Sequence, residues 1–176
     1  MAFGHILSVT TMKHLLLLRH AKSDWDDPQL PDIDRPLSAR GERDAPRIGE
    51  ALRKRKPQPE IILSSTARRT RETIVAVVEA ANLSIEPQFT SSLYAASASD
   101  ILKIVRGLPD DAASALLVGH NPGFEELASY LTGTWQAMPT GGLACIALDV
   151  SAWTDAKDDG RLEWFLSPKT LEDEDK

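Results

Sequence analysis

LLLLRHAKS, residues 15–23, joins a wholly apolar run to a strongly polar one. Four consecutive leucines predict a short strand that is buried on both faces, as in a parallel sheet. Arg19 and His20 then follow at the point where this strand ends. Because ligands of open α/β sheets bind outside the carboxyl ends of the strands, the pair is placed at a candidate binding edge.

Arg19 and His20 together suit phosphoryl chemistry. A permanent cation nearby disfavours imidazolium, so the His20 ring stays neutral more readily and keeps a lone pair. The guanidinium can hold phosphoryl oxygens while a ring nitrogen attacks the phosphorus. Taken alone, these residues are better explained as a surface Arg-His pair in a strand-to-helix loop, and the choice depends on the rest of the chain.

The same order of apolar strand, polar turn and helix occurs twice more. Residues 60–63, EIIL, lead into Ser64-Ser65 and a helix that opens with an arginine cluster. Residues 115–118, ALLV, lead into GHNPG at 119–123 and another helix. Helix N-termini favour anions through their free N–H groups and dipole. Three such junctions at one sheet edge predict a pocket that binds an anion and handles a phosphoryl group.

Several of these motifs resemble those of the histidine phosphatase superfamily, which has the phosphoglycerate mutase-like fold. They are RHA at 19–21, Ser64-Ser65 with Arg69 and Thr73, and Gly119-His120. RHAKS, DRPLS at 34–38 with Gly41, Leu93-Tyr94, GHNPG and TGG at 140–142 together resemble its SixA-type phosphohistidine phosphatase branch. The resemblance spans residues 13–150. It implies a three-layer α/β/α sandwich with a mostly parallel central sheet and a possible antiparallel edge strand.

The resemblance also implies roles for individual residues. His20 is the nucleophile, Arg19 and Arg69 bind the phosphoryl oxygens, and His120 is the second phosphate-binding histidine. Arg69 is chosen because the family's arginine stands four residues after the second serine of Ser64-Ser65. We expect Arg68 and Arg71 to be solvated. Candidate substrate-binding residues are Ser23, Asn121 and Tyr94, whereas His5 and His14 are expected to be bystanders.

The chain departs from the wider family at residues 91–96, SSLYAA, where the mutases and sugar-phosphate phosphatases carry an acidic proton donor. Without an acid, the alkoxide of a phosphate ester is a poor leaving group, whereas imidazole accepts a proton easily. The departure therefore fits a P–N substrate, and it also fits a weak or inactive relative. The expected activity is that of a protein phosphohistidine phosphatase that forms a phosphohistidine enzyme intermediate.

Two alternatives remain open. The first is a phosphatase for small-molecule phosphate esters that recruits another acid, such as Asp24 or Asp26, as proton donor. The second is a non-catalytic relative that only binds phosphate. The retention of Arg19, His20, Arg69 and His120 argues against the second, because drift would be expected to remove at least one of them.

Composition limits the other function classes. The net charge of −6 over 176 residues argues against a nucleic-acid partner. The single cysteine, Cys145, allows no intrachain disulfide, which fits a cytoplasmic location, and no apolar run is long enough to span a membrane. The histidines lack metal-ligand spacing, so no metal or other cofactor is expected. The expected partner is a phosphorylated histidine-containing protein or a small phosphorylated substrate.

The expected organisation is an N-terminal extension at 1–12, a histidine phosphatase domain at 13–168 and an acidic tail at 169–176. Within the domain, we expect a helix from Ser38 to about Arg55 that Pro46 kinks or splits, a short strand at 83–86 and a helix after Ser99. Strands at 142–150 and 161–166 are expected to pair at the sheet edge.

The sequence also predicts which residues surround the entrance of the pocket. The residues expected around it are Arg40, Arg43, Trp25 and Tyr94. We expect an open, basic rim that favours an acidic helical partner.

Overall fold

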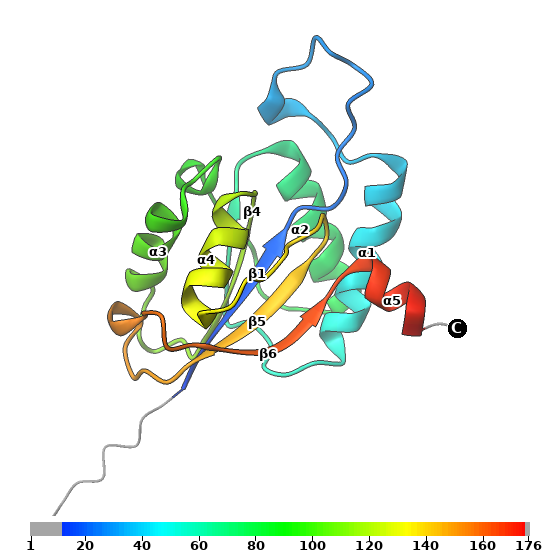
Figure 1. Cartoon of the computed structure of the whole chain (residues 1–176). Coiled ribbons are helices and arrows are strands. Elements are labelled where there is room, and N and C mark those ends of the chain that lie inside the picture. The colour runs from blue at the N-terminus through cyan, green and yellow to red at the C-terminus, as the bar shows by residue number, and fades with distance from the viewer. Residues whose placement is uncertain (1–11, 175–176) are drawn as a thin grey trace, which may run out of the picture.

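A computed structural model describes residues 12–174. Within these residues, six strands form one sheet in the order β3-β2-β4-β1-β5-β6 (Figure 1). The strands are β1 (Lys13–Arg19), β2 (Ile61–Ser65), β3 (Gln88–Thr90), β4 (Ser114–Gly119), β5 (Leu143–Leu148) and β6 (Arg161–Leu166). The pairs β1–β4, β2–β4 and β2–β3 are parallel, whereas β5 is antiparallel to both β1 and β6. The predicted mostly parallel sheet is confirmed.

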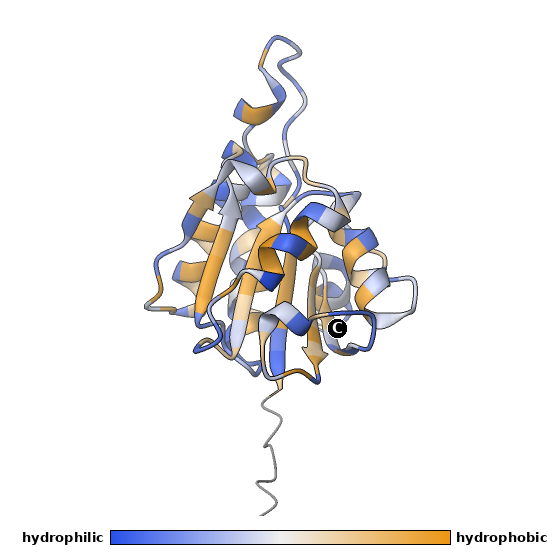
Figure 2. Cartoon of the chain, turned by 90° about the vertical axis from the view of Figure 1, so that its left-hand side faces the viewer, coloured by the Kyte–Doolittle hydropathy of each residue, from blue (hydrophilic) through white to orange (hydrophobic). Residues whose placement is uncertain are grey.

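Helices cover both faces of the sheet. On one side lie α1 (Ala39–Arg53), α2 (Arg68–Ala81) and α5 (Pro168–Glu174), and on the other α3 (Ala98–Arg106) and α4 (Gly123–Thr132) (Figure 1). Successive leucines of β1 point to opposite faces of the sheet. Leu15 and Leu17 pack in the core under α3 and α4, whereas Leu16 and Leu18 pack in the core under α1 and α2. The central strands are accordingly apolar along most of their length (Figure 2). The predicted three-layer α/β/α sandwich is confirmed.

Strand register brings the predicted polar residues together. Arg19 is opposite Gly119 in the β1–β4 pair, and Ser64 is opposite Val118 in the β2–β4 pair. The backbone N–H of His20 continues the pairing by donating to the Gly119 carbonyl at 3.1 Å. The residues that follow β1, β2 and β4 therefore meet at one edge of the sheet, as the sequence predicted.

The C-terminal strands form the predicted pair at the sheet edge, with one difference in detail. The edge strand is β6, which pairs with β5 from Leu143–Leu166 to Ala147–Arg161. The strand that runs against its neighbours is β5, and it lies one position in from the edge. A one-turn 3-10 helix, Trp153–Asp155, lies between the two strands, so they are not joined by a tight turn.

The strand predicted at 83–86 is wrong. α2 ends at Ala81, and the next residue, Asn82, caps it in a left-handed conformation. The third strand forms later, at Gln88–Thr90, against Leu63–Ser65. Leu83 and Ile85 instead pack on the core beneath α1 and α2 while the chain passes back to the sheet. The alternation in this segment reflects half-burial of a connecting segment rather than strand pairing.

Three other boundaries differ from the predictions. α1 is one continuous helix across Pro46 rather than two, and α3 is capped by Ser97, so it begins before Ser99. Most of the predicted acidic tail forms α5, and Leu171 packs with the core beneath α1. Apart from Met12, the predicted N-terminal extension falls outside the described residues. No helix within 12–174 is long and apolar enough to cross a membrane.

Gly41 fixes the approach of α1 to the loop after β1. The Ser38 side chain caps α1 by accepting from the Gly41 N–H at 3.2 Å, and Ser38 also donates to the Lys22 carbonyl. A Cβ at position 41 would lie 2.2 Å from that carbonyl oxygen. Only glycine fits this contact without moving the loop that carries His20.

We expect Gly41→Ala to destabilise the protein by about 1–3 kcal/mol, because the added methyl group overpacks a backbone contact. Urea unfolding of the variant against wild type measures this. Gly107→Ala is the matched control, since its nearest atoms would be 3.5 Å from a new Cβ. Equal stabilities for Gly41→Ala and wild type would show that the loop moves freely.

Candidate active site

Four predicted residues from three junctions form one cluster at the carboxyl edge of the sheet. Arg19 and His20 end β1, Arg69 lies in the first turn of α2, and His120 follows β4. The His20 and His120 ring centroids are 5.3 Å apart, and the side chain of Arg69 lies 3.3 Å from the His120 ring. His20, Arg69 and His120 are only 7%, 7% and 6% exposed. The cluster is therefore largely buried and is not a set of surface charges.

The tautomer of His20 follows from its backbone contact. Its Nδ1 lies 2.7 Å from the Ala21 carbonyl oxygen, which can only accept, so Nδ1 carries the proton. Nε2 then keeps a free lone pair. Burial lowers the pKa of His20 to about 4, with Arg69 and Arg19 contributing in the same direction. At neutral pH the ring is uncharged.

His120 is neutral for the same reason, but its ring is held differently. Arg69 Nη2 donates to Nδ1 at 3.3 Å, because a guanidinium has no acceptor. Nε2 therefore carries the proton and donates to the Ser65 hydroxyl at 2.8 Å. Burial lowers the pKa of His120 to about 3, and His20 and Arg69 add to the effect.

The two arginines supply the fixed positive charge. Arg19 donates through Nη1 to the Met138 carbonyl at 2.9 Å, while its Nε is buried without a hydrogen-bond partner in the described part of the chain. Arg69 is anchored through its own backbone, because its carbonyl accepts from the Thr73 hydroxyl at 2.7 Å. That hydroxyl also accepts from the Ala21 N–H at 3.0 Å. Thr73 therefore ties the His20 segment to the helix of Arg69.

The structure adds a carboxylate that the sequence did not reveal. Asp32, in the 3-10 helix Asp32–Asp34 between β1 and α1, lies 3.0 Å from Arg69 Nη2. The Tyr94 hydroxyl donates to the same carboxylate oxygen at 2.7 Å. The hydrogen bond from Tyr94 is the main cause that lowers the pKa of Asp32, and it raises the pKa of Tyr94. Nothing in the spacing links Asp32 to Arg69, which is 37 positions away.

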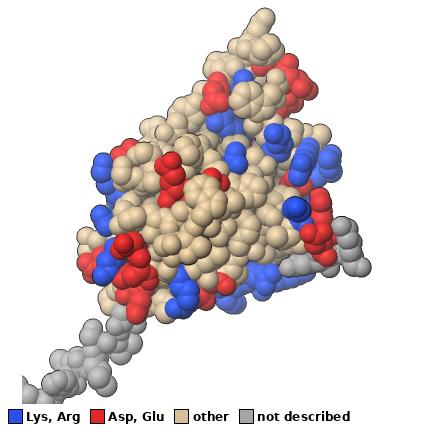
Figure 3. Space-filling model, in the orientation of Figure 1, with Lys and Arg blue, Asp and Glu red and all other residues tan. Residues whose placement is uncertain are grey.

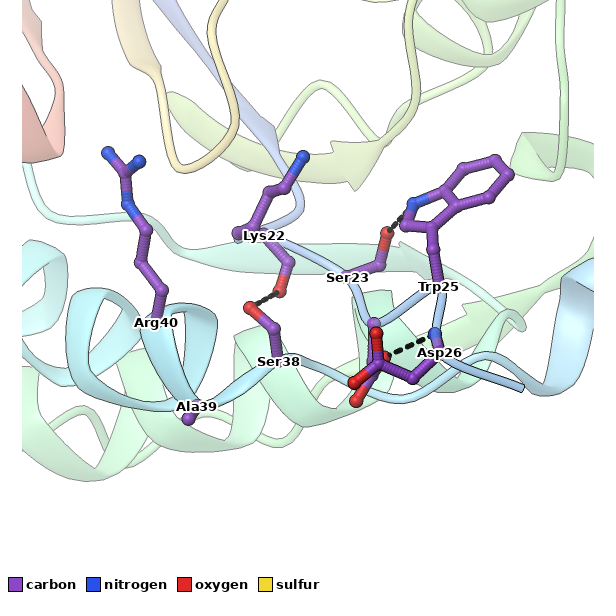
Figure 4. Close-up of a pocket in the computed structure, with 8 residues that line it drawn as sticks. Lys22, Ser23, Trp25, Asp26, Ser38, Ala39 and Arg40 are labelled. Carbon is purple, nitrogen blue, oxygen red and sulfur yellow. Dashed lines mark hydrogen bonds between the residues drawn. The ribbon is translucent and has the colours of Figure 1, made fainter. Parts of the chain in front are cut away.

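The three predicted substrate-binding residues lie in different surroundings. Tyr94 is at the cluster, with its ring edge-on to His120 at 5.5 Å. Ser23 is turned to a neighbouring hollow, where its hydroxyl accepts from Trp25 Nε1 at 3.2 Å (Figure 4). Asn121 donates to the Met138 carbonyl at 2.9 Å, the same acceptor that Arg19 uses. Asn121 therefore shares an anchor with Arg19, whereas Ser23 makes no contact with the two histidines.

The arginines that were expected to be solvated are exposed. Arg68 pairs with Glu72 at 2.7 Å, and the guanidinium of Arg71 lies over the Phe89 ring. His14 lies at the start of β1, away from the pocket edge, as expected for a bystander. His5 falls outside the described residues.

The segment between β1 and α1 is acidic, whereas a basic rim was predicted near it. The segment between β1 and α1 protrudes from the molecule, and carboxylates gather around its tip (Figures 1 and 3). These side chains belong to Asp24, Asp26, Asp27, Asp32 and Asp34. Cationic Lys22 and Arg40 line the neighbouring hollow, of about 580 Å³, together with Trp25 (Figure 4). Asp24 and Asp26 line the same hollow, so its charge is mixed rather than basic.

The two neutral histidines predict a specific dependence of stability on pH. An unfolded histidine takes up a proton near pH 6.5, whereas native His20 and His120 do so only near 4 and 3. As the pH is lowered from 6.5 to about 4, the free energy of unfolding therefore decreases by up to about 1.4 kcal/mol per pH unit for each histidine. We expect His120→Gln to remove one histidine's share of this slope in urea unfolding. A slope identical to that of wild type would contradict the buried, neutral state of His120.

Comparison with known proteins agrees with this geometry. Residues 15–93 match the model of the histidine phosphatase superfamily, branch 1. An uncharacterized chloroplast protein of Arabidopsis thaliana is 35% identical over 158 residues, which are 85% of this chain and 72% of that protein.

Solved structures extend the match over most of the chain. A putative phosphohistidine phosphatase SixA from Agrobacterium tumefaciens has a TM-score of 0.76 at 31% identity, covering 89% of this chain and 98% of that one. Its counterpart from Nakamurella multipartitia has a TM-score of 0.78 at 27% identity, covering 89% and 96%. The chain belongs to the histidine phosphatase superfamily, in its SixA-type branch, and is a hydrolase of the phosphatase class.

Proposed function

We propose that this phosphatase removes the phosphoryl group from phosphohistidine in a protein, through a phosphohistidine formed on its own His20. The observation that carries the proposal is the state of His20: its Nε2 is unprotonated, its ring is neutral, and two arginines lie beside it. A neutral imidazole among fixed guanidinium groups is suited to attack on an anionic phosphoryl group.

The residues divide the reaction into two in-line steps. In the first, Arg19 and Arg69 hold the phosphoryl oxygens, Nε2 of His20 forms a bond to phosphorus, and the bond to the leaving group breaks on the opposite side. In the second, a water oxygen attacks phospho-His20, and phosphate and the neutral imidazole are released. The bound anion raises the pKa of His120, because an opposite charge favours imidazolium, and the added proton on Nδ1 gives His120 an N–H that can donate to a phosphoryl oxygen when Arg69 binds the phosphoryl group.

The leaving group is the basis for choosing a P–N substrate. Asp32 is the carboxylate nearest to Tyr94, and its pKa is lowered by the hydrogen bond from Tyr94. An ionised carboxylate is a poor proton donor at neutral pH, so an alkyl phosphate ester would release an unprotonated alkoxide. Phosphohistidine needs no such acid when the second nitrogen of its ring is protonated. The small-molecule ester phosphatase is therefore the weaker alternative.

The proposal includes a partner, a cellular location and a reaction without a metal ion. The partner is a phosphorylated histidine-containing protein, which we place in the cytoplasm on the basis of the single buried thiol of Cys145. The two guanidinium groups supply the positive field for the phosphoryl oxygens, so the proposed reaction requires no metal ion.

We expect the wild-type protein to dephosphorylate a phosphohistidine-containing domain and to form an acid-labile, base-stable phosphoenzyme. His20→Ala should abolish both, because it removes the attacking nitrogen. Radiolabelled phosphoryl transfer, quenched in base and then exposed to acid, measures both quantities. His14→Ala is the matched control, since His14 lies at the other end of β1 and should leave both intact.

Three outcomes would overturn the proposal. Full turnover by His20→Ala would exclude the phosphoenzyme mechanism. Activity that is lost with a chelator and returns only with added metal would replace it with metal catalysis. Sugar phosphates hydrolysed as fast as the phosphohistidine protein would favour the ester phosphatase.

A further inference from the structure

Asp32 is the acidic group of the pocket, and it lies nearer the solvent than the histidines. Its side chain is 51% exposed, whereas that of Arg69, to which it is paired, is 8% exposed. Both side-chain hydrogen bonds to its carboxylate, from Arg69 and from Tyr94, end on Oδ2. No donor within residues 12–174 contacts Oδ1. One carboxylate oxygen at the mouth is therefore fixed in place, and the other remains free to accept from a substrate.

Asp32 lies on the solvent-exposed side of the cluster that holds the two histidines. In-line displacement places the leaving group on the far side of phosphorus from the attacking atom. His20 is only 7% exposed, so a group that departs on the side of phosphorus away from His20 faces the solvent. Arg69 Nη2 lies 3.0 Å from Asp32 Oδ2 and 3.3 Å from His120 Nδ1, so the Asp32 carboxylate lies beside the histidine pair.

We propose that Asp32 determines the leaving group of this enzyme: its carboxylate accepts a hydrogen bond from a protonated nitrogen of the departing group and thereby selects phosphoramidates over phosphate esters. This inference rests on the proposed function, because it assumes that His20 attacks the phosphorus. It differs from a proton-donor role, since Asp32 stays ionised throughout and gives no proton to the substrate.

The step balances without a further reactant. In phosphohistidine with a protonated second nitrogen, the ring is cationic while it is bonded to phosphorus. Nε2 of His20 forms its bond to phosphorus, the substrate P–N bond breaks, and the electron pair returns to the ring nitrogen that held the phosphoryl group. A neutral imidazole then leaves with the proton on its second nitrogen. A carboxylate that stabilises the cationic ring favours the form that can leave without a proton transfer.

The other carboxylates on the protruding segment also favour a cationic leaving group over an anionic one. Asp24, Asp26, Asp27 and Asp34 accompany Asp32 between β1 and α1 (Figure 3). Like charges disfavour a leaving group that carries a carboxylate or a second phosphate, as sugar bisphosphates do. The hydrogen bonds from Tyr94 and Arg69 lower the pKa of Asp32, so its carboxyl group stays ionised over the range in which an imidazole ring takes up a proton.

Two substrates separate this role from a structural one. Phosphoimidazole has a ring nitrogen that can donate to Asp32, whereas p-nitrophenyl phosphate has a good leaving group with no N–H. Asp32→Asn removes the charge but keeps an amide oxygen that can accept from Arg69 and Tyr94. We expect Asp32→Asn to lower kcat/KM for phosphoimidazole by about 10- to 100-fold, the effect of losing a charged hydrogen bond. The kcat/KM of the same variant for p-nitrophenyl phosphate should change by less than about threefold.

The matched control is Asp34→Asn, which removes one charge from an exposed position of the same 3-10 helix. It should leave the ratio of the two kcat/KM values unchanged. The pH profile provides a second measurement, because loss of Asp32 should move the alkaline limb for phosphoimidazole to lower pH, where the ring loses its proton more easily. The p-nitrophenyl phosphate profile should not move.

Equal losses on both substrates in Asp32→Asn would show that Asp32 only positions Arg69, and would overturn this inference while leaving the proposed function intact. An equal change of ratio in Asp34→Asn would overturn it as well, because the effect would then be one of net charge. Absence of His20-dependent turnover of phosphohistidine in the wild type would remove the proposed function, and this inference with it.

Discussion

The in-register parallel pairing of β1 with β4 is the constraint on which the site depends. Because Arg19 is opposite Gly119, the two histidines leave the sheet at the same height and from adjacent strands. The bond from the His20 N–H to the Gly119 carbonyl extends this register by one residue. A shift by one position would turn the leucines of β1 to the wrong layers of the core and separate the two imidazole rings. Core packing and site geometry are thus set by the same pairing.

Burial and charge then act together on the pocket floor. His20 and His120 lose water on folding, which disfavours imidazolium, and the neighbouring guanidinium groups disfavour it further. The result is a site whose positive charge belongs to arginines and whose two imidazole rings are uncharged. As a consequence, the protein is less stable at mildly acidic pH, because the two histidines take up protons in the unfolded chain but stay neutral in the native structure. Thr73 preserves the arrangement by joining the backbone near His20 to that of Arg69.

Much of this could be predicted from the sequence, and the limits have physical causes. Arg19, His20 and His120 follow short, continuous apolar runs, so the prediction of buried strands places them at the carboxyl edge of the sheet. Arg69 needed the family motif, because Arg68 and Arg71 are equally polar neighbours. Asp32 was missed because its contact with Arg69 depends on the path of a long connection, for which the sequence has no periodic signal. The segment at 83–86 misled because half-buried connections alternate as strands do, and the C-terminal acidic residues hid the single apolar anchor, Leu171.

The central claim is that the fold presents His20 as a neutral imidazole with its lone pair on Nε2, fixed by the bond from Nδ1–H to the Ala21 carbonyl. Nitrogen-15 NMR of the ligand-free protein tests this directly, because the two ring nitrogens report their protonation separately. The structure predicts a protonated Nδ1 and a bare Nε2 at neutral pH, with no titration of His20 until the pH approaches about 4. A proton on Nε2 at neutral pH, or a His20 pKa near 6.5, would contradict it.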